Sequence, residues 1–84
     1  MNRIHHCLKT LTKYFDAVEN GTKTFEVRYN DKNYKVGDYL ILQDWNGWER
    51  TGREIKVEVT YVLDNTDYCK DRYVILGFKR EIGG

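Results

Sequence analysis

Three charged side chains near the middle of the chain have the types and spacing of a polar binding site. Lys23, Glu26 and Arg28 lie close together in the stretch GTKTFEVRYND, residues 21–31. An arginine donates paired hydrogen bonds to a phosphate, and a lysine adds a compact positive charge. A carboxylate accepts hydrogen bonds from amino or hydroxyl groups. Gathered in one cleft, the three groups suit a planar polar ligand that carries a phosphate.

The alternation of residue types around this triad predicts a strand. Phe25, Val27 and Tyr29 alternate with Glu26 and Arg28, which is the period of a half-buried strand. Phe25 and Val27 are expected to face the core, and the two charged residues to share the other face. A solvated face with weak ion pairs, each worth under about 1 kcal/mol, is the simpler interpretation. A binding cleft is the alternative.

The elements that must position the triad are five short strands and one early helix. Leu11, Tyr14, Phe15 and Val18 have helical spacing. Thr12 is expected to cap this helix, and Gly21 to end it. Alternation and turn signals predict the following strands: Ile4 to Lys9, Thr24 to Tyr29, Tyr39 to Trp45, Glu54 to Leu63 and Tyr73 to Phe78.

These elements predict one domain spanning residues 1–84, mainly β with one or two short helices. In the strand from Glu54 to Leu63, the apolar residues at 55, 57, 59, 61 and 63 are expected to share the core face. Strands this closely spaced favour a small barrel over an open sandwich, because closure removes unpaired sheet edges. A core this thin leaves room for a surface cleft rather than a deep internal pocket.

The composition of the chain limits how it could bind nucleic acid and where it is expected to work. Fourteen basic and thirteen acidic residues give a net charge of +1, so nucleic acid can bind only through a local patch. No stretch predicts a signal peptide, a membrane span or a cofactor motif, and the expected location is the cytoplasm. Cys7 and Cys69 are expected to be free thiols, with a disulfide as the less favoured alternative, and Cys7 is expected to pack inward.

No metal site is predicted. His5 and His6 are adjacent on a strand, so their side chains point to opposite faces, and the chain has no further histidine. The acidic residues Asp64, Asp67 and Asp71 lack the spacing of a calcium-binding loop.

The triad also resembles a family signature. Residues 21–28 read G-x-K-x-x-E-x-R, which is similar to the signature of the ASCH domain, a PUA-like β-barrel named after the activating signal cointegrator. Further stretches resemble landmarks of a small bacterial and phage branch of that superfamily. They are His6 to Lys9, Tyr14 to Val18, Val36 to Asp38, Thr51 to Arg53 and Tyr73 to Leu76. The resemblance covers nearly the whole chain.

This resemblance implies a PUA-like barrel with a cleft beside the helix. Lys23, Glu26 and Arg28 would line the cleft, and His6 and Lys9 would face the same opening. Such clefts are thought to bind RNA or a nucleoside. The first functional hypothesis is therefore an RNA- or nucleotide-binding module, in which the cations contact phosphate and Glu26 accepts a hydrogen bond from a base or ribose. Candidate stacking or charged residues around the cleft are Trp45, Trp48, Arg50, Arg53 and Tyr73.

Two other functions remain open. Some ASCH proteins resemble amidohydrolases that remove an acyl group from a modified cytidine, using a Lys and a Thr within the signature. Here Glu26 occupies the position of that Thr nucleophile, so this mechanism is not expected, although Glu26 could act with Lys23 as a base on water. The third hypothesis is a protein-interaction domain without a nucleic-acid ligand, which the near-neutral charge favours.

Overall fold

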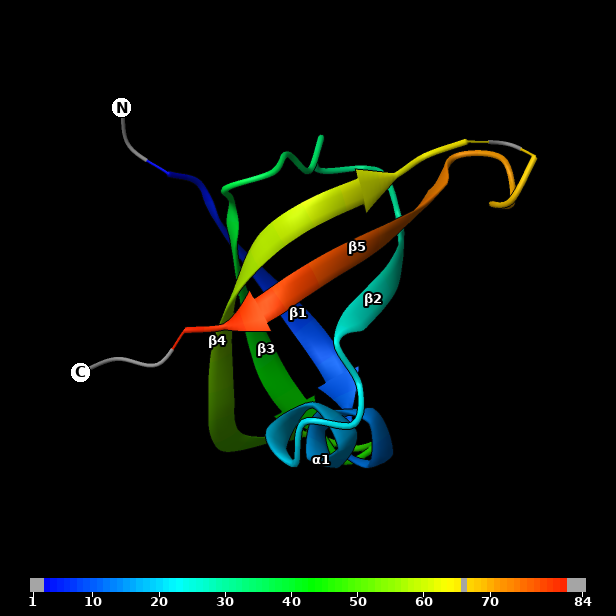
Figure 1. Ribbon diagram of the computed structural model, residues 1–84. Helices are drawn as coiled ribbons and strands as arrows, with labels where there is room; N and C mark the ends of the chain where they lie inside the picture. Colours follow the sequence, from blue (N-terminus) through cyan, green and yellow to red (C-terminus); the bar gives the residue numbers. More distant parts are fainter. Residues whose placement is uncertain (1–2, 66, 82–84) are drawn as a thin grey trace.

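The computed structural model describes residues 3–65 and 67–81, which form a curled sheet and one short helix (Figure 1). The elements in chain order are β1 (His5–Leu11), α1 (Thr12–Glu19), β2 (Phe25–Tyr29), β3 (Tyr39–Trp45), β4 (Arg50–Leu63) and β5 (Tyr73–Arg80). The mainly β fold class and the early helix are confirmed. In this part of the chain, no helix has the length and apolar character needed to cross a membrane.

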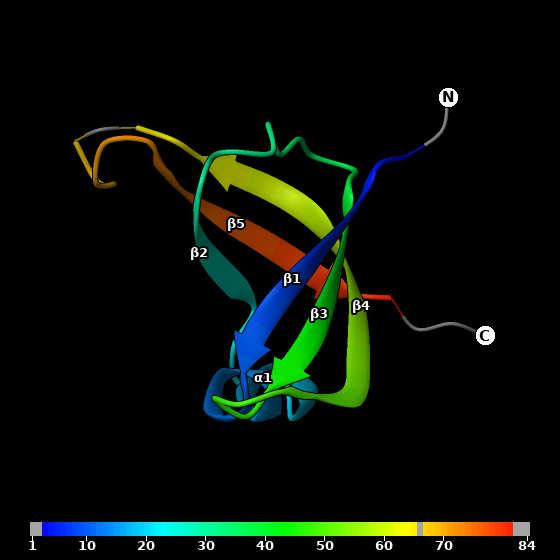
Figure 2. The ribbon, with the colours of Figure 1, turned by 180° about the vertical axis from the view of Figure 1, so that it is seen from behind.

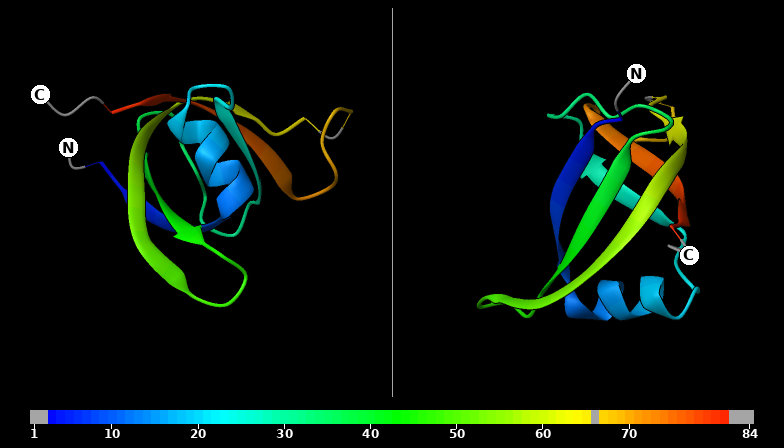
Figure 3. Two further views of the ribbon diagram at one scale, coloured as in Figure 1. Left: turned by 90° about the horizontal axis from the view of Figure 1, so that it is seen from below. Right: turned by 90° about the vertical axis from the view of Figure 1, so that its left-hand side faces the viewer.

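The five strands form one sheet in the order β1-β3-β4-β5-β2. β1 runs parallel to β3, and every other neighbouring pair is antiparallel. The sheet curls so far that its two edge strands, β1 and β2, approach each other, and α1 covers one open end (Figures 2 and 3). Within the described strands the ladder does not continue from β2 to β1. The result is a half-barrel rather than the expected closed barrel, and the β1–β2 opening is called the seam below.

The core fills the concave side of the half-barrel. β3, β4 and β5 contribute alternate residues to it, and Phe15 and Val18 of α1 close the lower end. The fully buried apolar side chains among the described residues are Phe15, Leu40, Leu42, Val57, Val59, Val74 and Leu76. Burying side chains of this size is the main source of stability in a small domain.

The face that β2 turns to the core is the reverse of the one predicted. Glu26 is buried with only 4% of its surface exposed, whereas Val27 is 53% exposed and Phe25 is also exposed. The alternation itself was right, since Glu26 and Arg28 share a face. That face points into the half-barrel because β2 is an edge strand beside the seam, where charged groups can pair with one another. The outer face of β2 is left with the apolar residues.

β4 also departs from the prediction. It begins at Arg50, and its register against β5 shifts between Val59 and Tyr61. Ile55, Val57 and Val59 are buried as expected, but the irregularity breaks the alternation and leaves Tyr61 exposed. An extra residue in one strand reverses the facing of everything after it, and alternation alone does not reveal where this happens.

α1 is anchored by a buried carboxylate rather than by the predicted cap. The N-cap residue is Leu11, without a side-chain cap bond, so the Thr12 cap was wrong. Instead, the Thr12 hydroxyl donates to Asp44 Oδ1, and Thr51 and Arg53 donate to Asp44 Oδ2. These hydrogen bonds, led by those from the two threonines, hold the pKa of Asp44 below its ordinary value.

This network predicts a pH dependence of stability. The pKa of Asp44 is lower in the folded protein than in the unfolded chain. The ionised carboxylate therefore adds fully to the free energy of unfolding above the unfolded pKa, about 4. This stabilisation is lost as the pH falls through the folded pKa. Asp44→Asn should therefore lower the midpoint of thermal unfolding at pH 7 by about 5–10 °C, and the difference should shrink below about pH 4. Calorimetry of both proteins across this range checks it. A difference that stays constant with pH would contradict this role.

Candidate functional site: a charged cleft at the seam

The end of α1 delivers Lys23 to the cleft. Gly21 adopts a positive φ of 85°, a conformation that suits glycine, and its N–H donates to Val18 O. The N–H groups of Thr22 and Lys23 then both donate to Ala17 O at 3.0 Å. Gly21 thus ends the helix as predicted, and the turn that it makes leads directly into β2.

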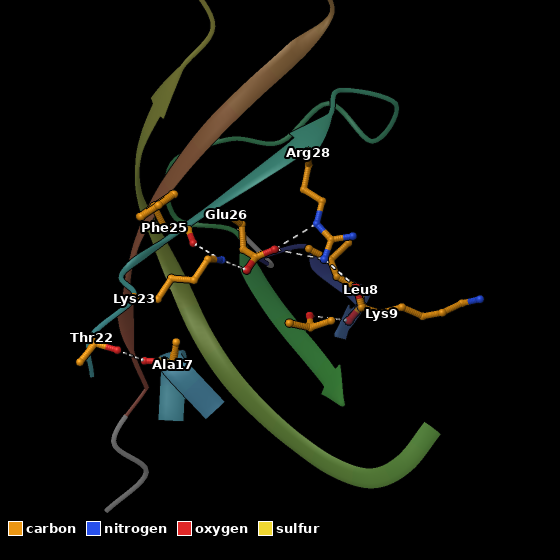
Figure 4. Close-up of polar contacts among 9 residues, drawn as sticks. Leu8, Lys9, Ala17, Thr22, Lys23, Phe25, Glu26 and Arg28 are labelled. Atoms are coloured by element: carbon orange, nitrogen blue, oxygen red, sulfur yellow. Dashed lines mark hydrogen bonds and ion pairs between the residues drawn. The ribbon is translucent and has the colours of Figure 1, made fainter. Parts of the chain in front are cut away.

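Glu26 holds the two cations of the triad from its buried position between them (Figure 4). Lys23 Nζ donates to Glu26 Oε1, and also to Phe25 O at 2.7 Å. Arg28 approaches from the opposite side, where its Nε and Nη2 donate to Glu26 Oε2 at 3.2 and 3.1 Å. A buried charge is tolerated only when it is paired in this way. The three groups therefore converge rather than splay into solvent.

The cations retain donors that Glu26 does not use. Lys23 Nζ has three hydrogens, and two acceptors lie within hydrogen-bond distance of it among residues 3–65 and 67–81. Over the same residues, Arg28 Nε and Nη2 are engaged, but no acceptor lies within reach of Nη1. Two positive charges against one carboxylate leave the triad with a net positive charge and free N–H groups for an anionic or carbonyl-bearing ligand.

Side chains bridge the seam where the backbone ladder stops. Arg28 Nη2 donates to Lys9 O at 2.7 Å, and Lys32 Nζ donates to Cys7 O at 3.2 Å. Both acceptors are carbonyls on the free edge of β1. Arg28 therefore has a double role, because it pairs with Glu26 and also ties β2 to β1.

The triad lies in a cleft of about 430 Å³ next to α1. We call it the triad cleft, and its lining residues are Lys9, Thr10, Leu11, Tyr14, Lys23, Phe25, Glu26, Val27 and Arg28. Apolar and aromatic groups form much of its wall, and the charged groups lie together. Such a hollow, mostly apolar with a few convergent polar groups, is typical of small-molecule sites.

Of the other predicted site residues, the structure brings Lys9 to the triad cleft. Its ammonium lies over the Trp45 ring, 4.6 Å from the centroid, so Trp45 supports Lys9 but is not itself a lining residue. Tyr14 and Leu11 line the cleft although the sequence predicted them as helix residues only. Their placement follows from the junction between β1 and α1, which no local pattern locates.

His6 does not share the opening with Lys9. It is buried on the concave side, where its Nε2 lies 2.8 Å from Asp38 Oδ2 and its ring packs edge-on against Tyr34. Residues three apart on a strand face opposite ways, so His6 and Lys9 cannot point together. Cys7 is exposed, which corrects its predicted inward packing, and both cysteines are free thiols.

Trp48, Arg53 and Tyr73 also lie away from the lining of the triad cleft. Trp48 is 89% exposed in the β3–β4 connection. Arg53 is engaged by carboxylates, and its guanidinium lies over the Phe15 ring. Tyr73 packs edge-on against Tyr29 and lines a different hollow with Ile75.

Thr22 Oγ1 donates to Ala17 O and to Asn20 Oδ1, which ties this hydroxyl to the end of α1 (Figure 4). Over residues 3–65 and 67–81, no group of three or more histidine, cysteine or carboxylate side chains is placed to hold a metal ion.

The fold and the site define a small half-barrel protein with a cation-rich cleft at its seam. The chain belongs to the family described as "Domain of unknown function (DUF3850)", which matches residues 5–78. It is also similar to the "Uncharacterized 12.9 kDa protein in GpA 3'region" of Escherichia phage P2. The two are 43% identical over 76 residues, which cover 90% of this chain and 68% of the phage protein.

Proposed function

We propose that this protein binds RNA, or a nucleotide of it, in the triad cleft. The observation that carries the proposal is the convergence of Lys23 and Arg28 on the buried Glu26, at one cleft with apolar walls. Cations with free N–H groups fit a phosphate, and a neighbouring apolar wall fits a base.

Each lining group has a role in this proposal. Lys23 and Arg28 donate to the phosphate or to base carbonyls, and Lys9 adds charge at the mouth. Tyr14 offers its ring for stacking, which is worth about 1–3 kcal/mol per base. Glu26 is a positioning residue, because both of its oxygens already accept hydrogen bonds from the two cations. This differs from the role in base recognition that the sequence predicted.

The resemblance to ASCH domains supports the same proposal. The signature residues Lys23, Glu26 and Arg28 gather at one cleft beside α1, as that resemblance implies. We accordingly propose that the half-barrel is a reduced PUA-like barrel, and that it binds RNA in the cytoplasm.

Titration of short single-stranded RNA by fluorescence anisotropy tests the proposal. Lys23→Gln should weaken binding about 5- to 10-fold, because it removes one charged donor while Arg28 still pairs with Glu26. The slope of log affinity against log salt should fall by about 0.7, as expected for one phosphate contact on a single strand.

Lys79→Gln is the matched control. Lys79 is an exposed residue of β5 that loses the same charge outside the lining of the triad cleft. It should leave the affinity within about twofold of wild type. Equal loss of affinity in both variants would mean that RNA is attracted by the overall charge of the protein and not by the triad cleft. Absence of binding by the wild-type protein would also overturn the proposal.

A further inference from the structure

A second hollow lies on the other side of the Arg28 bridge. It has a volume of about 420 Å³ and is called the edge hollow here. The residues lining it are Cys7, Leu8, Lys9, Arg28, Tyr29, Asp31, Lys32, Tyr34 and Arg50. Four of these side chains are cationic and one is a carboxylate. The apolar wall that characterises the triad cleft is largely replaced here by polar groups.

Among the residues that the structure describes, three of the four cations of the edge hollow have no ion pair, whereas the fourth, Arg28, pairs with Glu26. In the described part of the chain, no carboxylate lies within ion-pair distance of Lys9, Lys32 or Arg50. Their polar contacts are with neutral groups. Lys32 donates to Cys7 O, and Arg50 Nε donates to Gln43 Oε1.

Arg53 shows the contrast within the same protein. Its guanidinium lies 3.0 Å from both Asp16 and Asp44, and 3.5 Å from Glu19. This structural arginine is thus surrounded by negative charge. In a chain with a net charge of only +1, a cluster of unpaired cations concentrates positive potential at one place.

The two hollows are neighbours that share two lining residues. Lys9 and Arg28 line both of them, and the Arg28 guanidinium crosses the seam to Lys9 O between them. A ligand whose first unit occupies the triad cleft can therefore extend directly over Lys9 and Arg28 into the edge hollow. Successive units of a nucleic acid strand are linked by phosphates, the groups that unpaired cations recognise.

We propose that the edge hollow binds a backbone phosphate of a single strand whose neighbouring nucleotide occupies the triad cleft, with Lys32 and Arg50 as its specific contacts. This inference rests on the proposed function, because it concerns the same ligand. It adds that the protein reads a strand of at least two nucleotides rather than a free nucleotide. The groups recognised are phosphate oxygens, which RNA and DNA share, so this second contact does not distinguish the two.

Binding is measured for two kinds of probe: the nucleoside 5′-monophosphates, and labelled uridine oligoribonucleotides of about ten nucleotides, within the usual range of single-strand sites. The double variant Lys32→Gln/Arg50→Gln should weaken oligomer binding about 10-fold. It should lower the salt slope by about 1.4, which corresponds to two cations. Monophosphate affinity should stay within about twofold of wild type. A thymidine oligodeoxynucleotide should show the same relative loss.

Cys7 supplies a reporter of occupancy, because this exposed thiol lines the edge hollow while Cys69 is buried. The oligomer should slow alkylation of Cys7 by iodoacetamide, and a monophosphate should not. The control variant Lys56→Gln/Lys79→Gln removes two charges from exposed positions on β4 and β5 outside both linings. It should leave both affinities unchanged. Thermal unfolding of each variant confirms that it is folded.

The outcomes separate the two proposals. If Lys23→Gln weakens oligomer binding but Lys32→Gln/Arg50→Gln does not, the proposed phosphate site in the edge hollow is overturned. The proposed binding in the triad cleft then still stands. Equal weakening of monophosphate and oligomer in the double variant also overturns the edge hollow as a separate contact. Failure of wild-type protein to bind any probe overturns both.

Discussion

Replacing Lys23 and Arg28 together by methionine should destabilise the protein by about 3–5 kcal/mol. The double variant leaves the buried Glu26 carboxylate without either of the cations that pair with it. An uncompensated buried charge has a cost of this size. Total stability for a small domain is about 5–15 kcal/mol, so much of it would be lost. Urea unfolding followed by tryptophan fluorescence measures the change.

Adding Glu26→Met to the double variant should restore most of the stability. Apolar residues of similar volume often replace a buried ion cluster without loss, because no charge then has to be removed from water. The triple variant should nevertheless fail to bind RNA, since it lacks every charged group of the triad. A folded, binding-deficient triple variant would separate the function of these residues from their structural role. A double variant as stable as wild type would show that Glu26 is not dependent on its cations.

Phe15→Ala should have the other large effect, a loss of about 3–5 kcal/mol. Phe15 is 1% exposed and closes the lower end of the half-barrel, with the Arg53 guanidinium 4.7 Å from its ring centroid. Truncation removes buried apolar contacts and leaves a cavity, which has a cost in this range. Phe15→Leu keeps most of the volume and should lose about 1 kcal/mol. A small effect of Phe15→Ala, measured by urea unfolding, would mean that α1 contributes little to the core.

Substitution of Tyr14, the residue next to Phe15, should affect RNA binding more than stability. Tyr14 is partly exposed and lines the triad cleft, with Lys23 Nζ 5.4 Å from its ring centroid. Tyr14→Ala should change stability by less than about 1 kcal/mol but weaken RNA binding about 5- to 100-fold, if one base stacks on the ring. The pair Phe15→Ala and Tyr14→Ala thus compares adjacent residues of α1, one buried in the core and one exposed at the cleft.

Local patterns in the sequence predicted most of the elements. All five strands were located, and the bounds of β3 were predicted as observed, because its apolar run is flanked by clear turn residues. The three charged residues of the triad were also identified as a set from their spacing. Their convergence depends on a strand, a turn and a glycine, which are all local features.

What the sequence did not reveal depends on contacts between distant segments. Alternation shows that Glu26 and Arg28 share a face, but not whether that face is inside, since this depends on where the sheet ends. The irregularity at Tyr61 and the hydrogen bonds to Asp44 also depend on contacts between segments that are distant in the sequence. Lys32 and Arg50 carried no signal of a joint role, because they are 18 positions apart and line one hollow only in the folded sheet.

The bridges across the seam also bear on self-association. β1 pairs within the described sheet only with β3, so its other edge presents the carbonyls of Cys7 and Lys9. Unprotected edges of this kind recruit strands from other molecules and lead to fibres. Arg28 and Lys32 occupy those carbonyls and place two like charges where a second molecule would have to dock. We therefore expect these two side chains to disfavour edge-to-edge association of two copies of the chain.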